Sequence, residues 1–203
     1  MAMQQAMYPV QFSVDYPDRQ LNRLTTAFRI IVAIPSLIVL GSVSGGTWVG
    51  ASGAGGVLFM GPLLMILFRR KYPRWWFDWN LELQRFTNRV VIYLALMDDR
   101  YPATDQEQAL HLNYIYPDAT RDLNRWLPLV KWLLVIPHLI VLIFLWIAAI
   151  VVIISAWFAI LFTGRYPKAL FEFVEGVFRW GQRVIAYAFL LVTDSYPPFR
   201  LAP

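Results

Sequence analysis

The chain contains no cysteine, so the sequence excludes a disulfide framework and thiolate chemistry. Charge is also scarce, because Asp, Glu, Lys and Arg make up only 15% of the 203 residues while hydrophobic residues make up 58%. Two stretches lack charged side chains altogether, 39 residues from Ile30 to Phe68 and 33 residues from Trp132 to Gly164. Uncharged apolar runs longer than ~18 residues predict membrane segments rather than the core of a soluble enzyme.

The residues outside these stretches indicate which side of the membrane the chain occupies and what it binds there. The net charge is +5, and the basic residues gather in the polar segments, where anionic lipids attract them. They form no dense basic run, so no nucleic-acid partner is expected. Residues 1–18 lack a basic region followed by an apolar one, so we expect no cleaved signal peptide and a cytoplasmic N-terminus.

The two halves of the chain resemble each other, which predicts an internal repeat. Six or more similar features recur in the same order, including an alternating strand pattern, a Leu-Asn-Arg triplet, an Ile-Pro motif followed by Leu-Ile-Val-Leu, and Tyr-Pro doublets at the ends of elements. The first copy carries eight more residues in its Gly-rich middle. We therefore expect repeat one at 8–102 and repeat two at 110–203.

Each repeat is predicted to hold a short helical hairpin in the membrane, at about 27–68 and about 127–163. A straight helix of 33 residues would reach ~50 Å, against a hydrocarbon core of ~30 Å. Hairpins also place all 18 Lys and Arg on one side, as the preference for cytoplasmic basic loops requires. The expected fold is thus an all-α integral membrane protein with both termini cytoplasmic and short cytoplasmic β-strands before the hairpins.

A segment that mixes charges with Trp, Phe and Leu follows each hairpin, at about 74–97 and about 168–192. We interpret both as amphipathic helices that lie in the membrane interface. Each carries two arginines four residues apart, which share one helical face. These are the candidate lipid-headgroup residues Arg85, Arg89, Arg179 and Arg183. The alternative is pairing with acidic residues of the same helices, such as Glu82 and Glu175.

Two further features are candidate sites. His138 is an ionisable residue inside the second apolar stretch, which marks a functional hypothesis by default. A structural role is favoured, because the chain has only one other histidine and so offers almost no ligand set for a metal or haem. The Gly-rich patch provides small residues suited to close helix packing. The candidates there are Gly45, Gly46, Gly53, Gly55 and Gly56.

Several motifs of the second half resemble a bacterial membrane family known as domain of unknown function 4389. They are Ile-Pro-His-Leu-Ile-Val-Leu at 136–142, Ala-Trp-Phe-Ala-Ile-Leu-Phe-Thr-Gly-Arg-Tyr-Pro at 156–167, and Thr-Asp-Ser-Tyr-Pro-Pro-Phe at 193–199. The first half departs from the pattern, with Arg-Arg-Lys at 69–71 in place of Thr-Gly-Arg. The resemblance implies a bacterial inner-membrane protein in two tandem copies, and it supplies no activity or catalytic residues.

The sequence favours a non-enzymatic accessory or scaffold subunit of a bacterial inner-membrane complex. No set of residues has the spacing of a catalytic, cofactor or metal site, whereas aromatic and small residues suited to membrane contact are plentiful. The expected partners are another membrane protein and membrane lipids, mainly anionic ones. The alternative is a lipid-binding or membrane-shaping protein that acts through the paired arginines.

Overall fold

The computed structural model describes residues 8–43 and 60–203 of the chain. The candidate packing glycines Gly45, Gly46, Gly53, Gly55 and Gly56 lie outside these described residues. The described part is mostly helical, with two short strands. Its elements are β1 (Val10–Val14), α1 (Arg23–Ala27), α2 (Arg29–Val43), α3 (Met60–Leu64), a π-helical turn η3 (Met65–Arg69), α4 (Arg74–Leu94), β2 (Leu110–Tyr114), α5 (Pro128–Leu134), α6 (Ile136–Thr163) and α7 (Lys168–Ala188).

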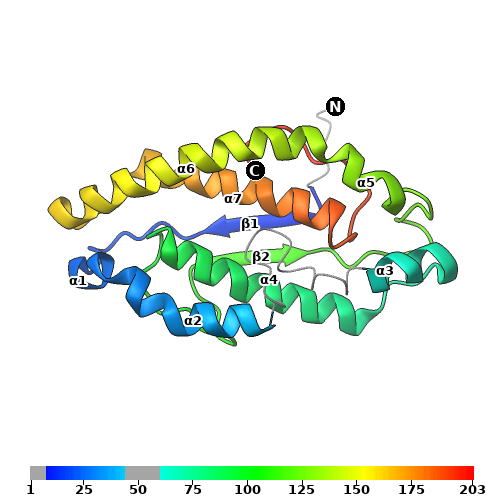
Figure 1. The fold of residues 1–203 in the computed structure, drawn as a ribbon, viewed down its shortest axis with the longest axis horizontal. Coiled ribbons are helices and arrows are strands. Elements are labelled where there is room, and N and C mark those ends of the chain that lie inside the picture. Colours follow the sequence, from blue (N-terminus) through cyan, green and yellow to red (C-terminus); the bar gives the residue numbers. More distant parts are fainter. Residues whose placement is uncertain (1–7, 44–59) are drawn as a thin grey trace, which may run out of the picture.

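The longer helices and both strands run along the long axis of the molecule (Figure 1). The apolar helices α6 and α2 form opposite outer edges, α7 packs on α6, and α4 packs on α2. The strand pair lies between them, with β1 against α7 and β2 against α4. Helices α4 and α7 are therefore inner elements, and α2 and α6 are the two flanks.

The strands form because apolar and polar residues alternate in both, and the two antiparallel strands pair with each other. Their apolar side chains are buried and those between them are exposed, a pattern of one covered face and one open face. Phe12 of β1 faces Leu112 of β2 near the middle of the pair. The short strands expected before the apolar stretches are thus present.

Helices α4 and α7 each begin directly after a Tyr-Pro doublet, at Pro73 and Pro167, whose extended backbone ends the preceding segment. Both are amphipathic, as the sequence indicates. We expected them to lie in the membrane interface, but most of their residues are buried inside the protein. The physical reason is that their polar faces have partners within the chain, namely the strand edges and the segments that follow each helix.

The helical hairpin expected at about 127–163 is not formed. A short helix, α5, is followed by one uninterrupted helix of 28 residues, α6, which ends at Gly164 in the left-handed conformation with φ +74°. The hairpin prediction was wrong here because no Gly or Pro interrupts the sequence between Leu139 and Phe162, so nothing favours a turn over continued helix. Length alone suggested the hairpin.

The first half differs at the same place. Its apolar stretch forms α2 at one end and α3 with η3 at the other, and the turn of the expected hairpin lies outside the described residues. Arg70, with φ +48°, ends η3 in the same left-handed conformation in which Gly164 ends α6. The two apolar stretches therefore end alike.

The two halves interlock through their Tyr-Pro doublets. The hydroxyl of Tyr16 donates to the carbonyl of Tyr166 at 2.5 Å, and the hydroxyl of Tyr116 donates to the carbonyl of Tyr72 at 2.6 Å. In each case the tyrosine after one half's strand bonds the doublet before the other half's inner helix. The halves thus exchange equivalent contacts through these doublets.

Candidate functional site

Arg85 and Arg179, the first candidates for lipid binding, bond the two strands instead. The Nε of Arg85 donates to the carbonyl of Leu112 at 3.0 Å, and the Nε of Arg179 donates to the carbonyl of Phe12 at 2.9 Å. Leu112 and Phe12 are register partners in the strand pair. Glu175 accepts from the amide of Val14 at 3.3 Å. Side chains of α4 and α7 therefore satisfy backbone groups at the outer edges of a sheet that has only two strands.

Arg89 and Arg183, one helical turn later, bond the segments that follow their helices. Arg89 donates to the carbonyls of Ala103 and Thr104, each at 3.1 Å. Arg183 donates to the carbonyls of Arg200 at 3.1 Å and Ala202 at 2.8 Å. Burial, together with the positive charges of Arg200 and Arg179, lowers the pKa of Arg183 to about 10. These arginines hold the segment that follows each inner helix against that helix.

Two of the arginines also pair with acidic residues of their own helices. Arg85 forms an ion pair with Glu82 at 2.6 Å, and Arg179 pairs with Glu175. Arg89, Arg179 and Arg183 are buried, whereas the side chain of Arg85 is 32% exposed. The structure thus gives all four arginines partners inside the chain, and Arg85 is the one that retains substantial access to a headgroup.

A second equivalent pair, which the sequence analysis did not single out, consists of the buried cations Arg29 and Lys131. The Arg29 guanidinium lies 4.5 Å from the ring centre of Tyr93, and the Lys131 ammonium lies 4.8 Å from that of Tyr187. Both donate to a backbone carbonyl after the inner helix, and Lys131 also pairs with Asp194 at 2.6 Å. Burial lowers the pKa of Lys131, and the hydrogen bond and charge of Asp194 oppose that shift.

His138 lies on the buried face of α6, against α7. Its Nδ1 accepts from the Trp180 indole N–H at 3.0 Å, and its ring stacks on Phe199 with centres 3.8 Å apart. An Nδ1 that accepts a hydrogen bond places the proton of the neutral ring on Nε2, and Nε2 is buried without a partner. The contacts tie α6 to α7 and to the C-terminal segment. Within 8–43 and 60–203, no group of three or more His, Asp or Glu residues could hold a metal ion.

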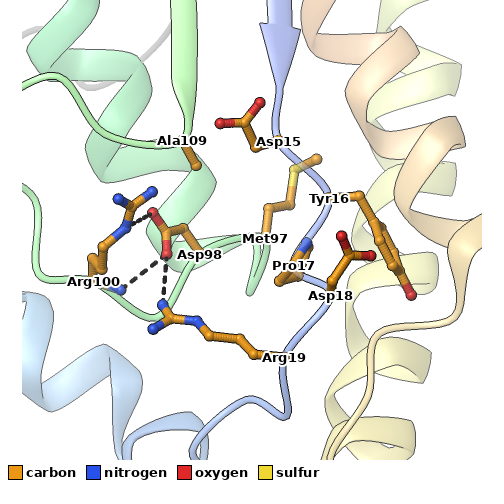
Figure 2. A pocket seen from close by; sticks show the side chains of 9 residues that line it. All are labelled: Asp15, Tyr16, Pro17, Asp18, Arg19, Met97, Asp98, Arg100 and Ala109. Atoms are coloured by element: carbon orange, nitrogen blue, oxygen red, sulfur yellow. Dashed lines mark hydrogen bonds and ion pairs between the residues drawn. The ribbon is translucent and has the colours of Figure 1, made fainter.

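A cleft of about 330 Å³ opens where β1 ends and where the chain leaves α4 (Figure 2). The buried carboxylate of Asp98 accepts from Arg100 Nε at 2.9 Å and lies 3.5 Å from an Arg19 nitrogen. Arg19 also pairs with Asp99. Asp15, directly after β1, lies at the edge of the cleft and bonds His111 at 3.1 Å. The ion pairs of Arg19 and Arg100 join two segments of the first half, and the Asp15–His111 contact joins the first half to the second.

The sequence could have indicated some of these contacts. Arg29 and Lys131 stand at the same distance before the Ile-Pro motif in their two halves, so this matching spacing was the signal. The Asp98 cleft had no such signal, because its residues come from two separated segments and form no motif.

Residues 126–200, which span α5, α6 and α7, match a family model described as "Domain of unknown function (DUF4389)". The second half is similar to DUF4389. The match supports the family resemblance noted in the sequence, and since it does not extend into the first half, it does not confirm two tandem copies. Comparisons with curated proteins and with solved structures give no match. The DUF4389 match carries no catalytic residue or ligand, so the functional argument rests on the geometry.

Proposed function

We propose that this chain is a non-enzymatic accessory or scaffold subunit of a bacterial inner-membrane complex. The observation that carries the proposal is the surface of α6. This helix is long and apolar enough to cross a membrane, judged by length and composition, and only five of its 28 residues are buried in the protein. The buried five are His138, Leu142, Ala149, Ala156 and Ile160.

The exposed apolar residues of α6 are too numerous for a surface that faces water. Thirteen large ones are exposed over more than a third of their area, with values that range from 37% at Leu139 to 78% at Phe162. Covering half-exposed side chains of this size is worth ~1 kcal/mol each, so the whole face is worth on the order of 10 kcal/mol. Patches of this extent mark membrane or protein contacts. The α2 flank adds seven more such residues, from Ile30 to Val43.

We further propose that the two halves are tandem copies, in which the strand of each copy packs on the inner helix of the other. Three equivalent contact pairs support this: Arg85 and Arg179 on the strand edges, Arg29 and Lys131 over tyrosine rings, and the doublet hydrogen bonds of Tyr116 and Tyr16. Interlocked halves make a rigid body. Rigidity with two apolar flanks suits a subunit that holds other membrane components in place.

The second candidate is a lipid-binding or membrane-shaping protein. Exposed cations at the ends of the apolar helices favour it, for example Arg70 and Lys71 after η3 and Arg165 after α6. The paired arginines support it less, because their guanidinium groups bond the chain itself. The two candidates differ in whether the chain contacts a second protein.

The experiment is a pull-down of the tagged chain from native membranes in polymer nanodiscs, with protein and lipid both read by mass spectrometry. A photoreactive residue at Ile147 probes the α6 face, and the same residue at Asn113, on the open face of the sheet, is the matched control. The proposal predicts a stoichiometric protein partner that crosslinks through Ile147. A lone chain with one enriched anionic lipid would favour the second candidate instead.

A further inference from the structure

We infer that α6 lies along the membrane surface within one leaflet of anionic lipid, with both of its ends on the same side, and that it does not cross the bilayer. The inference rests on the proposed function insofar as the chain must be membrane-bound. It goes further, because it specifies the surface that contacts lipid, the kind of lipid and the orientation of the body.

Exposed basic residues lie beyond both ends of α6. Arg121 precedes the α5–α6 pair, Arg165 and Lys168 follow α6, and all three side chains are exposed. Basic segments beside a membrane helix stay on the cytoplasmic side, where anionic lipid attracts them. A hairpin would bring both ends to that side, but α6 is one uninterrupted helix. A continuous helix can keep both ends on one side only by lying parallel to the surface.

Charged residues of α7 and α4 lie level with the middle of α6 along the long axis of the molecule. Trp146 of α6 packs against Phe178 of α7, with ring centres 5.1 Å apart. The next residue, Arg179, bonds Phe12, whose strand partner Leu112 bonds Arg85. Figure 1 shows these elements running along the same axis as α6.

A crossing orientation would therefore bring the Arg85–Glu82 and Arg179–Glu175 pairs to the depth of the bilayer midplane. The Glu82 side chain is 56% exposed and would face hydrocarbon. Charged groups at that depth are costly and line a protein interior or a water-filled cavity. In the flat orientation the same groups lie within one leaflet at about the depth of α6, away from the bilayer midplane.

Dimensions agree with the flat orientation. A helix of 28 residues is ~42 Å long, against a hydrocarbon core of ~30 Å. The other flank, α2, has 15 residues and is ~22 Å long, which is too short to cross. Because α2 and α6 form opposite edges of one body, a body lying flat places both at the same depth. The parts of the apolar flanks that no protein partner covers then face acyl chains, and the basic ends face anionic headgroups.

The absence of cysteine makes the test direct, because each single-cysteine variant carries one reactive thiol. Trp126→Cys and Arg165→Cys place thiols at exposed positions before α5 and just after α6, and Ser13→Cys on the open face of the sheet is the matched control. Each is labelled with a membrane-impermeant maleimide, first in spheroplasts and then in inverted vesicles. The inference predicts that Trp126→Cys and Arg165→Cys both stay unlabelled in spheroplasts and are both labelled in inverted vesicles, together with the control.

A depth measurement complements the labelling. Fluorophores on Ile140→Cys, Ile150→Cys and Phe162→Cys are quenched by spin labels at shallow and deep acyl positions, in vesicles of phosphatidylcholine with phosphatidylglycerol. Equal depth at the three sites is the expected result. Labelling of the two ends from opposite sides, with Ile150 alone at the midplane, would overturn the inference and leave the proposed function standing. A chain that remains in solution when these vesicles are sedimented would contradict both.

Discussion

Arg85 and Arg179 hold equivalent positions on opposite edges of one strand pair. Their Nε atoms donate to the carbonyls of Leu112 and Phe12, two residues that face each other across the sheet. Each arginine belongs to one half of the chain and bonds the strand of the other half. These contacts account for arginines on the polar faces of α4 and α7, and they explain how a sheet of two strands is stable.

Replacement of Arg179 by Met should lower the free energy of unfolding by ~3–5 kcal/mol, because it leaves the largely buried Glu175 carboxylate without its counter-ion and the Phe12 carbonyl without the Arg179 donor. Arg85→Met should cost ~1 kcal/mol, since the Arg85–Glu82 pair is more exposed. Arg74→Met, on the exposed Arg74–Asp78 pair, is the control and should change little. Thermal unfolding in mild detergent measures all three. Equal stability of Arg179→Met and the parent chain, with loss of bound lipid, would instead identify Arg179 as a headgroup ligand.

The doublet hydrogen bonds should contribute independently. Tyr16→Phe and Tyr116→Phe each remove one hydroxyl donor between the halves, so each should cost ~1 kcal/mol. If the two hydrogen bonds stabilise the interface independently, the double variant should lose the sum of the two single losses in unfolding free energy. Denaturant titration of the single and double variants tests this expectation. A double variant no less stable than either single variant would argue against the interlocked arrangement.

Gly176 is where the C-terminal segment packs most closely on α7. A Cβ there would lie 2.9 Å from Leu201 Cβ and 3.2 Å from the Leu201 carbonyl oxygen. Gly176→Ala should therefore displace this segment and destabilise the fold by ~1–3 kcal/mol. Gly181→Ala is the matched control on the same helix, because its Cβ would meet only Trp146, at an ordinary 3.9 Å. Gly176→Ala should be cleaved faster in the C-terminal segment by limited proteolysis and should unfold at a lower temperature than Gly181→Ala.

Because of Lys131, the free energy of unfolding should vary with pH in the alkaline range. Burial lowers its pKa in the folded state below the usual 10.5, so the unfolded chain binds the proton more tightly. Stability should then rise with pH as Lys131 loses its proton in the folded state, in the range below 10.5. Lys131→Met should flatten that rise, whereas Lys131→Arg should keep the charge and the cation–tyrosine contact. Unfolding measured across this range in the three proteins gives the result, and an unchanged slope in Lys131→Met would contradict the assignment.

Local patterns in the sequence were sufficient to place the two strands and the two inner helices. The alternation at Val10–Val14 and Leu110–Tyr114 predicted the strands, and the Tyr-Pro doublets marked the beginnings of α4 and α7. These features depend on neighbours in the chain, which a single sequence displays. The predicted ends of both inner helices, at about 97 and 192, lie a few residues beyond the observed ends at Leu94 and Ala188.

Contacts between the halves could not be predicted in the same way. The arginine pairs were assigned to lipid because nothing in the sequence shows that the carbonyls of Phe12 and Leu112 lie beside them. The hairpin at 127–163 was inferred from length against bilayer thickness, an argument that assumes a helix perpendicular to the membrane. Because α6 is one uninterrupted helix, no hairpin forms there. A helix parallel to the membrane surface can be longer than the bilayer is thick, so its length does not require a hairpin.

Membrane extraction tests the central claim, that lipid or a membrane partner covers the α6 face, most directly. Membranes that carry the full chain are washed in high salt and then at alkaline pH, and the pellet and supernatant are compared with those of Phe144→Ser/Ile147→Ser/Ile150→Ser. The account predicts that the parent chain stays in the pellet through both washes and that the triple variant shifts toward the supernatant. Release of the parent chain as a soluble monomer would contradict the account, because thirteen large exposed apolar side chains on α6 would then face water.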